Sequence, residues 1–307
     1  MDAPVPSPFH TSSGAPLRWG AEDIWQQLQP LLPGVSVEVV ARTDSTNTRL
    51  IERARAQAGQ RDAPVSRPGE LRDVGDVPRA PYGRRAGDTE PCLLVAEHQT
   101  GGRGRLGRDW LGSAGASLTF SLALPLAPRD WSGLSLAVGV ALAEALDIAP
   151  PRIGLKWPND LWILDGPGRG RKLGGILIET VPVNQRRMCI VGVGLNVLPQ
   201  PAEGLTHGYA CLQELDGDTS APRALAAVAA PLVRALQRFE AEGFAAFQAG
   251  FERRDLLAGL PVTTTGAEPL HGVAEGVDER GALRVRAGTL HTLVSGEVSV
   301  RLRDDAC

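Results

Sequence analysis

The sequence predicts an α+β protein that ends in a small all-β domain. Helical and strand patterns are interspersed as far as residue 257, whereas the residues that follow show only short alternating segments such as 283–285. Glycine-containing turns, for example at 278–281, join these segments, and this pattern is typical of a small β-barrel at about 258–303. The length of 307 residues and the hydrophobic content of 43% suffice for one large and one small domain.

The first part of the chain is expected to begin as a tail and then to alternate helices with strands. Residues 1–34 form the tail: the first sixteen are rich in proline and serine, which favours disorder, and a short helix is expected at 22–32. The large domain is expected at 35–257 and the C-terminal domain at 258–307. The further elements expected are a strand at 35–40, a helix from the capping residues 44–47 to about residue 58, a flexible insertion at 59–91 and a strand at 93–97.

The second half of the large domain is expected to contain both strands and helices. Pro158 forces a turn or a sheet-edge position within the segment 155–164, and a glycine-rich loop at 165–171 separates this segment from the next strand. The remaining elements expected are strands at 117–124, 173–179 and 188–197, an amphipathic helix at 134–146, a helix at 225–239 and a second helix through residue 251.

The composition excludes several classes of protein. The formal net charge of −3 argues against a protein whose main task is to bind nucleic acid. The four cysteines show no C-x-x-C spacing and the five histidines no H-E-x-x-H pattern, so a zinc site built from side chains is not expected. No signal peptide is evident, and the apolar run 136–146 is too short to span a bilayer. We therefore expect a cytoplasmic protein with reduced thiols that binds neither nucleic acid nor membrane.

The most distinctive stretch is Gly101–Trp110, in which four glycines alternate with three arginines. The glycines permit close approach of the backbone to a ligand, while arginine offers a rigid charged fork for phosphate or carboxylate. The stretch is not a Walker A loop, because no Gly-Lys-Ser/Thr follows it. The alternative is a solvated basic hairpin, although such a loop has no need of four glycines. We therefore predict an anion-binding loop.

Two further segments combine cations with polar groups. Lys172 directly precedes the apolar segment Leu173–Ile176, where a lysine needs an anionic partner; the alternative is a solvated lysine at the strand end. Lys156–Asp160 combines a cation, an aromatic ring, a proline turn, an amide and a carboxylate. Asp160 is a candidate Mg²⁺ ligand and Asn159 a candidate contact for phosphate oxygens, with capping of the turn as the alternative.

Polar residues at the ends of other elements are suited to a neutral ligand. Ser45, Thr46 and Asn47 carry hydroxyl and amide groups, although helix capping accounts for one of them without a ligand. Gln99 by itself is an ordinary polar residue at a strand end. The segment Gly192–Asn196 begins like a dinucleotide fingerprint but lacks a third glycine, so we expect a strand that bulges at its second glycine and turns Asn196 toward a ligand.

Taken together and in this order, the motifs resemble those of biotin–protein ligases. The ordered set is highly specific and covers about residues 35–303 apart from the insertion. The resemblance implies a mixed β-sheet packed with helices, similar to class II synthetases and biotinyl/lipoyl ligases, followed by an SH3-like β-barrel. The matching motifs are Asp44-Ser-Thr-Asn47, Glu97-x-Gln99, Gly102-Arg-Gly-Arg-x-Gly-Arg-x-Trp110, Lys156-Trp-Pro-Asn-Asp-Leu161, Lys172-Leu-Gly-Gly-Ile-Leu-Ile-Glu179 and Gly192-x-Gly-x-Asn196.

The resemblance also implies an activity. Ligases of this family join biotin to ATP with Mg²⁺, which gives biotinyl-5′-adenylate and pyrophosphate, and pass the biotin to a lysine on the biotin carboxyl carrier domain of a carboxylase. Bringing a carboxylate to an α-phosphate requires cations that offset the repulsion between the two anions, and arginines and a lysine provide them. The neutral ureido ring of biotin instead needs hydroxyl and amide partners.

Each candidate residue receives a role from the resemblance. Lys172, Arg105 and Arg103 are expected at the carboxylate and phosphate, and the arginine loop is expected to close over the adenylate. The residues expected to bind biotin are Ser45, Thr46, Asn47, Gln99, Gly102, Arg103, Gly104, Arg105 and Lys172. The residues expected to bind the nucleotide are Arg105, Arg108, Trp110, Asn159, Asn196 and Tyr209.

Two alternative functions remain at this point, a lipoate–protein ligase and a non-catalytic biotin-binding protein. The hydroxyl-rich Ser45-Thr46 turn and the arginine loop favour biotin, and the presence of Lys172 and Arg105 favours catalysis. Some biotin–protein ligases carry an N-terminal helix-turn-helix and repress transcription. Here at most one helix precedes the strand that begins at Val35, so we expect a ligase without the DNA-binding domain, as a monomer or a homodimer.

Overall fold

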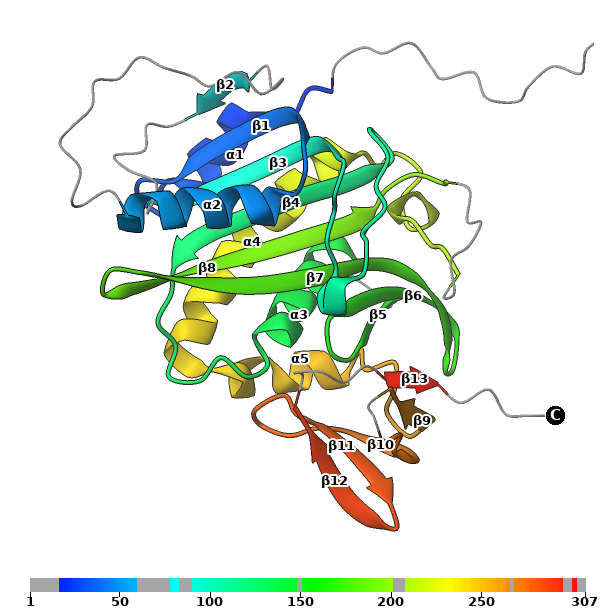
Figure 1. The fold of residues 1–307 in the computed structure, drawn as a ribbon. Helices are drawn as coiled ribbons and strands as arrows, with labels where there is room; N and C mark the ends of the chain where they lie inside the picture. The colour runs from blue at the N-terminus through cyan, green and yellow to red at the C-terminus, as the bar shows by residue number, and fades with distance from the viewer. Residues whose placement is uncertain are drawn as a thin grey trace, which may run out of the picture.

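The fold consists of a large mixed sheet with helices on both faces and a smaller sheet formed by the C-terminal strands (Figure 1). It is seen in a computed structural model that describes residues 17–59, 78–82, 90–147, 151–200, 208–265, 268–294 and 300–302. The predicted α+β class is confirmed: helices alternate with the strands of the large mixed sheet along the chain, and the elements described after residue 260 are all strands.

The large sheet has eight strands in the order β2-β1-β3-β4-β8-β7-β6-β5. Strands β1 and β3 are parallel, and every other neighbouring pair is antiparallel, so the sheet is mixed as predicted. β4 is buried along almost its whole length because both of its faces are covered. The strands are β1 (Ser36–Thr43), β2 (Pro78–Tyr82), β3 (Cys92–Gln99), β4 (Ser117–Pro125), β5 (Ile153–Lys156), β6 (Asp160–Gly166), β7 (Arg169–Val183) and β8 (Arg186–Asn196).

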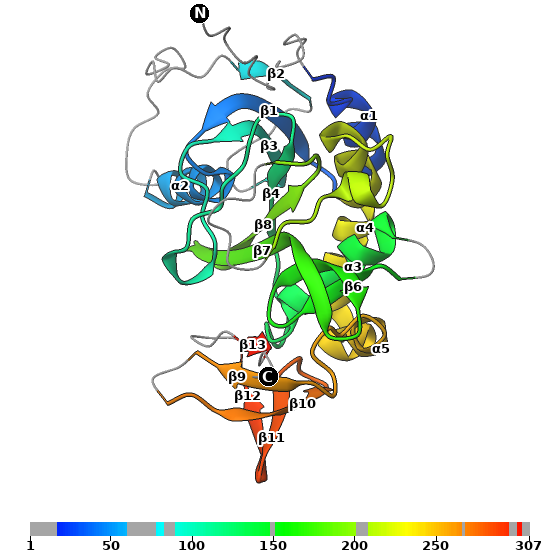
Figure 2. The ribbon, with the colours of Figure 1, turned by 90° about the vertical axis from the view of Figure 1, so that its right-hand side faces the viewer.

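The helices divide between the two faces of this sheet (Figures 1 and 2). α2 (Thr46–Gly59) packs on one face over a small core that includes Leu50, Leu94 and Ile190. The opposite face carries the main core, to which α1 (Ala21–Leu28), α3 (Leu134–Leu146) and α4 (Ala221–Glu242) contribute. A 3-10 turn and the short helix α5 (Gln248–Glu252) then lead to the C-terminal strands. The face with α2 alone leaves room for the loop that follows β3.

The C-terminal strands form a five-stranded antiparallel sheet in the order β12-β11-β10-β9-β13. They are β9 (Pro261–Thr264), β10 (His271–Val277), β11 (Leu283–Ala287), β12 (Thr289–Leu293) and β13 (Val300–Leu302). The turn between β10 and β11 joins the two sheets, because the Gly281 carbonyl accepts a 3.1 Å hydrogen bond from Trp157 Nε1 and Arg280 pairs with Asp130 at 2.8 Å. Gly281 needs to be a glycine there, since a Cβ would lie 2.8 Å from Gly133 Cα.

Two helices differ from the sequence prediction. The helix expected at 22–32 ends at Leu28, because Pro30 and Pro33 cannot supply the backbone donors that a longer helix requires. The helix at 134–146 is present but is not amphipathic, since Leu134 and residues 136–143 are all buried. The reason is its place in the fold: α3 packs on β5 and β7 of the sheet and also against α4 and α5, so several of its sides are covered.

The expected insertion contains a strand. β2 falls within residues 59–91, which were expected to be flexible, and it pairs antiparallel with β1 at the end of the large sheet. β1 would otherwise be an open edge strand, and such edges readily accept a partner. The rest of this segment, 60–77 and 83–89, lies outside the described residues, as does the expected disordered tail 1–16.

Two expectations about glycines are also wrong. The segment 165–171 is not a loop: β6 and β7 form a hairpin closed by Pro167 and Gly168, so Lys172 lies within β7 and not ahead of a strand. The positive φ of 66° at Gly168 permits this tight turn. Gly194 is not a bulge either, because it pairs in regular register with Thr119 on one side and Gly175 on the other.

Candidate active site

A cavity of about 450 Å³ is lined by residues of α2, of the loop that follows β3 and of the large sheet. This loop lies over the same face of the sheet as α2 (Figure 1). The volume of the cavity is in the range usual for small-molecule sites. Gly102 is the one predicted site residue that does not line it; its carbonyl accepts a 2.8 Å hydrogen bond from Trp110 N at the base of the loop. The predicted residues that line the cavity are Ser45, Thr46, Asn47, Gln99, Arg103, Gly104, Arg105, Arg108, Trp110, Asn159, Asp160, Lys172, Asn196 and Tyr209.

One end of the cavity is a pocket of buried hydroxyl and amide groups. The backbone N and the Oγ1 of Thr46 donate to Gln99 Oε1 at 2.7 and 3.0 Å. Ser121 Oγ on β4 lies 2.6 Å from both Thr46 Oγ1 and Asn47 Oδ1. Ser45 caps α2, since its Oγ accepts from Thr48 N at 3.4 Å. These groups carry no net charge, so this end suits a neutral polar ligand.

Asn47 is held in this pocket by contacts at both ends of its amide. Its Oδ1 faces Ser121, while its Nδ2 donates to the Leu177 carbonyl at 3.2 Å and to Glu179 Oε2 at 2.9 Å. Gly192 on β8 makes room for it, because a Cβ at that position would lie 2.3 Å from Asn47 Oδ1. Gly192 is therefore required because the side chain of Asn47 approaches it closely, and not because it contacts a nucleotide phosphate.

The arginine loop crosses the cavity as a closed turn. Gly104 N donates to the Arg108 carbonyl at 2.6 Å, and Arg108 N donates to the Arg105 carbonyl at 3.2 Å. Leu106 at its tip has a φ of 57°, a left-handed conformation that is uncommon for a residue other than glycine. Leu106 is also 53% exposed. The loop thus holds its arginines over the cavity and points an apolar side chain toward solvent.

Trp110 closes the loop and stacks against the sheet. A Cβ on Gly194 would lie 2.5 Å from Cε2 of the Trp110 ring, so the glycine is required for the ring to reach β8. Trp110 Nε1 is buried and has no hydrogen-bond partner among the described residues. A buried donor of this kind is costly unless an acceptor is supplied. Trp110 lines the cavity, so its ring is available as a surface for an aromatic ligand.

Two lysines and an aspartate lie on one face of strands β5, β6 and β7. Lys172 Nζ lies 2.9 Å from Asp160 Oδ1, and Lys156 Nζ lies 4.7 Å from the centroid of the Trp162 ring. Register explains the grouping: Lys156 pairs with Asp160, and Trp162 pairs with Lys172. Directly paired residues share a face of a sheet, so all four side chains point to the cavity side.

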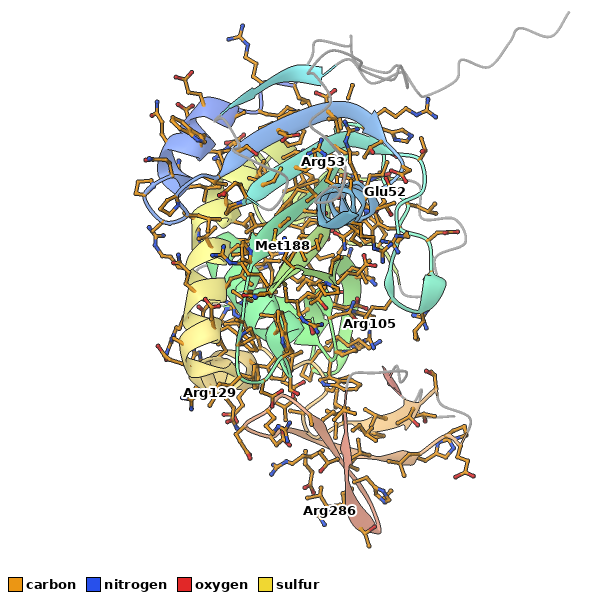
Figure 3. All side chains as sticks on the ribbon, turned by 60° about the vertical axis from the view of Figure 1, so that its left-hand side comes forward. Glu52, Arg53, Arg105, Arg129, Met188 and Arg286 are labelled. Atoms are coloured by element: carbon orange, nitrogen blue, oxygen red, sulfur yellow. The ribbon has the colours of Figure 1, made fainter. Side chains whose placement is uncertain are left out.

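Arg105 adds a further cation to this end of the cavity (labelled in Figure 3). Its Nη1 donates to Asn159 Oδ1 at 3.3 Å, and the Asn159 Nδ2 donates in turn to the Ile176 carbonyl at 2.7 Å. Burial lowers the pKa of Arg105; the nearby carboxylate of Asp160 opposes this shift, and Arg108 adds to it. Arginine stays protonated in proteins, so a half-buried guanidinium here favours the binding of an anion.

The segment after β8 completes the far wall. Tyr209 forms an isolated bridge with Lys172, and Ala210 N donates to the Lys172 carbonyl at 3.0 Å. Asn196 Nδ2 donates to that same carbonyl at 3.2 Å and to the Ala210 carbonyl at 3.0 Å. The Tyr209 hydroxyl donates to the Leu198 carbonyl at 2.6 Å, and burial raises its pKa to about 12. Asn196 thus fixes the backbone at Lys172 and Ala210, next to Tyr209.

No group of three histidine, cysteine, aspartate or glutamate side chains that could hold a metal is found in the described part of the chain. The cavity is lined by two carboxylates, Asp109 and Asp160. Mg²⁺ in nucleotide sites is usually held by one or two carboxylates together with phosphate oxygens and water. Asp160 could hold Mg²⁺ in this way together with bound phosphates. The described protein groups alone could not form a metal site.

Several residues of the site were not predicted. Ser121 and Gln200 complete polar contacts, Lys156 adds a cation, and Glu179 joins Asn47 to Arg103. Lys156 begins the motif 156–161 and Glu179 ends the motif 172–179, so the sequence marks both positions but not their contacts. Ser121 carries a weaker signal, a hydroxyl inside an apolar strand.

Comparisons with known proteins agree with this geometry. Residues 86–196 match the biotin/lipoate A/B protein ligase family, and residues 261–301 match the biotin protein ligase C-terminal domain. The first match contains the arginine loop and both lysines of the cavity. The second covers the five-stranded C-terminal sheet, as the expected SH3-like domain requires.

Individual relatives extend over most of the chain. The bifunctional ligase/repressor BirA of Escherichia coli is 31% identical, with 90% of this chain and 77% of that protein covered. The biotin–[acetyl-CoA-carboxylase] ligase of Mycobacterium tuberculosis is 30% identical, with 92% of each chain covered. Among solved structures, the biotin protein ligase of Aquifex aeolicus in complex with biotin and ATP has a TM-score of 0.64 and 27% identity, covering 87% of this chain and 99% of that one.

Proposed function

The chain belongs to the biotin protein ligase family, and on this basis we propose that it activates biotin with ATP and transfers it to a lysine of a biotin carboxyl carrier domain. One observation carries the proposal: a pocket of neutral polar groups around Thr46 and Gln99 opens directly onto the cations Arg105 and Lys172. A ligand that fills both ends has a neutral polar head and reacts at an anionic tail. Biotin, with its ureido ring and valerate carboxylate, has this form.

In the first half-reaction, the biotin carboxylate attacks the α-phosphorus of ATP and pyrophosphate leaves. The ureido ring of biotin forms hydrogen bonds with the hydroxyl and amide groups of Ser45, Thr46, Asn47 and Gln99. Lys172, Arg103 and Arg105 offset the repulsion between the carboxylate and the phosphate. They also stabilise the charge that develops on the phosphate oxygens in the transition state. We assign no side-chain nucleophile, because the carboxylate of biotin itself is the nucleophile.

The nucleotide occupies the part of the cavity between the arginine loop and the segment after β8. We assign Trp110 and Tyr209 to the base and ribose side, with Asn196 holding the backbone beside them. The position of Trp110 in the lining of the cavity supports this assignment, since its ring offers a purine a stacking surface. Arg108 and Asn159 face the phosphate side.

Magnesium enters this proposal with the nucleotide. Asp160 is the residue that would hold it, because its carboxylate lines the cavity beside Lys172 and Arg105. One carboxylate combined with phosphate oxygens is a usual arrangement for Mg²⁺. When bound, the ion neutralises charge on the leaving pyrophosphate. The chain's own residues then have to orient the carboxylate and the α-phosphate, which is the task of Lys172 and Arg105.

In the second half-reaction, the ε-amine of a carrier lysine attacks the biotinyl carbonyl carbon, and AMP leaves. The acceptor amine must reach the carbonyl while water is excluded, since water would hydrolyse the same mixed anhydride. The arginine loop is placed to do this: it covers the cavity through residues 103–108 and rests on the sheet through Trp110. We propose that it opens for the substrates and closes over the adenylate.

We further propose that the chain acts as a ligase alone, in the cytoplasm, with its catalytic domain at 35–257 and its C-terminal domain at 258–307. α1, the helix ahead of β1, is part of the core of the large sheet through Ile24 and Leu28. It therefore packs against the catalytic domain and is not available as a DNA-reading helix. In the described residues no helix has the length and apolar character needed to cross a bilayer. We propose a monomer or a homodimer.

The direct test is incubation of the protein with ATP, Mg²⁺, biotin and a carrier domain, followed by intact mass measurement of the carrier. The expected result is a mass gain of one biotinyl group that requires ATP and is lost when the acceptor lysine of the carrier is replaced. Lipoate in place of biotin is the matched comparison, because the polar pocket around Thr46 and Gln99 gives its apolar dithiolane ring no partner. Preferential transfer of lipoate would reject the proposal.

A further inference from the structure

Glu179 on β7 connects two parts of the site that are far apart in the sequence. Its Oε2 accepts a 2.7 Å hydrogen bond from Arg103 Nη2 in the arginine loop and a 2.9 Å hydrogen bond from Asn47 Nδ2 in the polar pocket. Glu179 itself does not line the cavity, whereas both of its partners do. A single carboxylate therefore joins the residues proposed to bind the head and the tail of biotin.

We propose that Glu179 is a positioning residue for biotin binding, and that it acts through Arg103. The inference rests on the proposed function, because it assigns to Glu179 the task of holding Arg103 where the carboxylate tail of biotin arrives. Arginine has five N–H donors in a planar fork, so one bond to Glu179 leaves other donors for a ligand. The bond also fixes the plane of the guanidinium, and this lowers the entropy that Arg103 loses on binding.

The ion pair between Arg103 and Glu179 contributes little to the stability of the fold. The side chain of Arg103 is 43% exposed and that of Glu179 is 26% exposed, and ion pairs with this much exposure contribute little to stability. The arginine loop also rests on the sheet through Trp110, a contact that does not involve the Arg103–Glu179 pair. The conformation of the loop backbone is held by hydrogen bonds such as that from Gly104 N to the Arg108 carbonyl. Loss of Glu179 therefore frees the side chain of Arg103 and leaves the loop in place.

Asn47 depends on Glu179 less than Arg103 does. Its amide keeps the contact of Oδ1 with Ser121 and the bond from Nδ2 to the Leu177 carbonyl when Glu179 is removed. Its side chain is also confined by close packing on Gly192. Among the described residues, Glu179 is the acidic partner of Arg103. The consequence of removing the carboxylate should accordingly be found at Arg103.

The experiment is a double-mutant cycle on biotin adenylation, measured as pyrophosphate release, with Glu179→Gln, Arg103→Ala and the double variant. Gln keeps the shape of Glu179 but loses the charge-assisted bond to Arg103. We expect Glu179→Gln to raise the KM for biotin about tenfold in the otherwise wild-type enzyme and to change kcat by less than about twofold. In the Arg103→Ala background, the same change should alter the KM less than about twofold, because the residue through which it acts is gone.

Two controls separate this inference from simpler explanations. Glu275→Gln breaks a comparable exposed pair with Arg286 on the C-terminal sheet and should leave the KM for biotin unchanged. Glu179→Asp keeps the charge on a shorter side chain and should give an intermediate KM. An equal effect of Glu179→Gln in both backgrounds, or no effect in either, would overturn the inference. Failure of the wild-type protein to form biotinyl-adenylate would instead reject the proposed function, so the two failures are distinct.

Discussion

The ammonium group of Lys172 and the carboxylate of Asp160 lie 2.9 Å apart, from strands β7 and β6 of the same sheet. Their side chains are 31% and 20% exposed, so the pair faces the cavity and is not a buried structural bridge. The arrangement holds a cation at the point where the carboxylate and the α-phosphate are proposed to meet. Asp160 orients the ammonium while the site is empty, and phosphate oxygens then compete for it.

Replacement of Lys172 by alanine should abolish most of the activation step. We expect biotin-dependent exchange of pyrophosphate into ATP to fall by about two to three orders of magnitude, because a preorganised charge at the transition state is lost. The midpoint of urea unfolding should change little, because a partly exposed ion pair contributes at most about 1 kcal/mol. Lys172→Arg, which keeps the charge but changes its geometry, should recover only part of the rate. Near-normal exchange in the alanine variant would remove Lys172 from the mechanism.

Gly194→Ala should weaken binding of the nucleotide. The new Cβ would lie 2.5 Å from Cε2 of the Trp110 ring, and the neighbouring ring atoms are also within 3 Å, so the ring must move. We expect the KM for ATP to rise about tenfold or more, since the loss of a stacking surface costs on the order of 1–3 kcal/mol. Gly217→Ala is the matched control, because a Cβ there meets nothing within 4 Å. Equal KM values for ATP in the two variants would show that Trp110 does not bind the nucleotide.

Arg105→Ala should release the adenylate. Arg105 is half-buried at the cavity through its contact with Asn159, and removing it opens the lid on the phosphate side. We expect biotinyl-5′-adenylate to escape and to label amines of a bystander protein, measured by streptavidin blotting. The ligase itself should gain little label, because the sequence contains only two lysines, Lys156 and Lys172, and both line the cavity.

The control for this release is Arg129→Ala. Arg129 is exposed and lies well away from Arg105 (Figure 3), so its loss tests the general effect of removing one surface arginine. Bystander labelling should stay at the wild-type level in this variant. If Arg105→Ala retains its adenylate for as long as the wild type, the loop does not depend on this arginine for closure.

The sequence predicts which segments line the cavity, but it does not predict the contacts between side chains that are far apart in the chain. Gly101–Trp110 and Lys156–Asp160 break the periodicity of helices and strands, so a local reading is enough to identify them as site segments. Glu179 gives no such signal: it ends an ordinary strand pattern, and its proposed role depends on Arg103, which is 76 residues away in the chain. The same limit explains Gly194, which was expected to form a bulge. Its glycine is required by Trp110, a contact that no local pattern encodes.

Strands with a clear hydrophobic pattern were predicted correctly. Elements whose formation or burial depends on packing against distant segments were not. β4 and β8 follow from their alternating or apolar runs. β2 has two prolines in five residues, which argues against a strand, yet it forms because β1 offers it an unpaired edge. The expected amphipathic helix is α3, whose polar side is absent because α4 covers it.

Asp255, in the connection between α5 and β9, should make the stability of the fold depend on pH. Its Oδ1 accepts a hydrogen bond from Leu257 N at 2.9 Å, while its Oδ2 is buried and has no partner among the described residues. Burial raises the pKa of Asp255 to about 6; bonds from the backbone of Leu257 and Ala258 oppose the shift, and the charge of Glu252 adds to it. The native state therefore holds a proton that the unfolded chain releases near pH 4.

The sign of the effect follows from this difference in pKa. Between about pH 4 and pH 6 the native state binds more protons than the unfolded chain, so the free energy of unfolding falls as the pH rises, and above pH 6 the full cost of the buried carboxylate is present. Asp255→Asn keeps the acceptor for Leu257 N and removes the charge. We expect it to stabilise the protein more at pH 8 than at pH 5, by about 1 kcal/mol, measured by urea unfolding. Asp218→Asn corrects for the loss of one exposed carboxylate. Equal stabilisation at pH 5 and pH 8 would mean that Asp255 is ionised in the native state throughout this range.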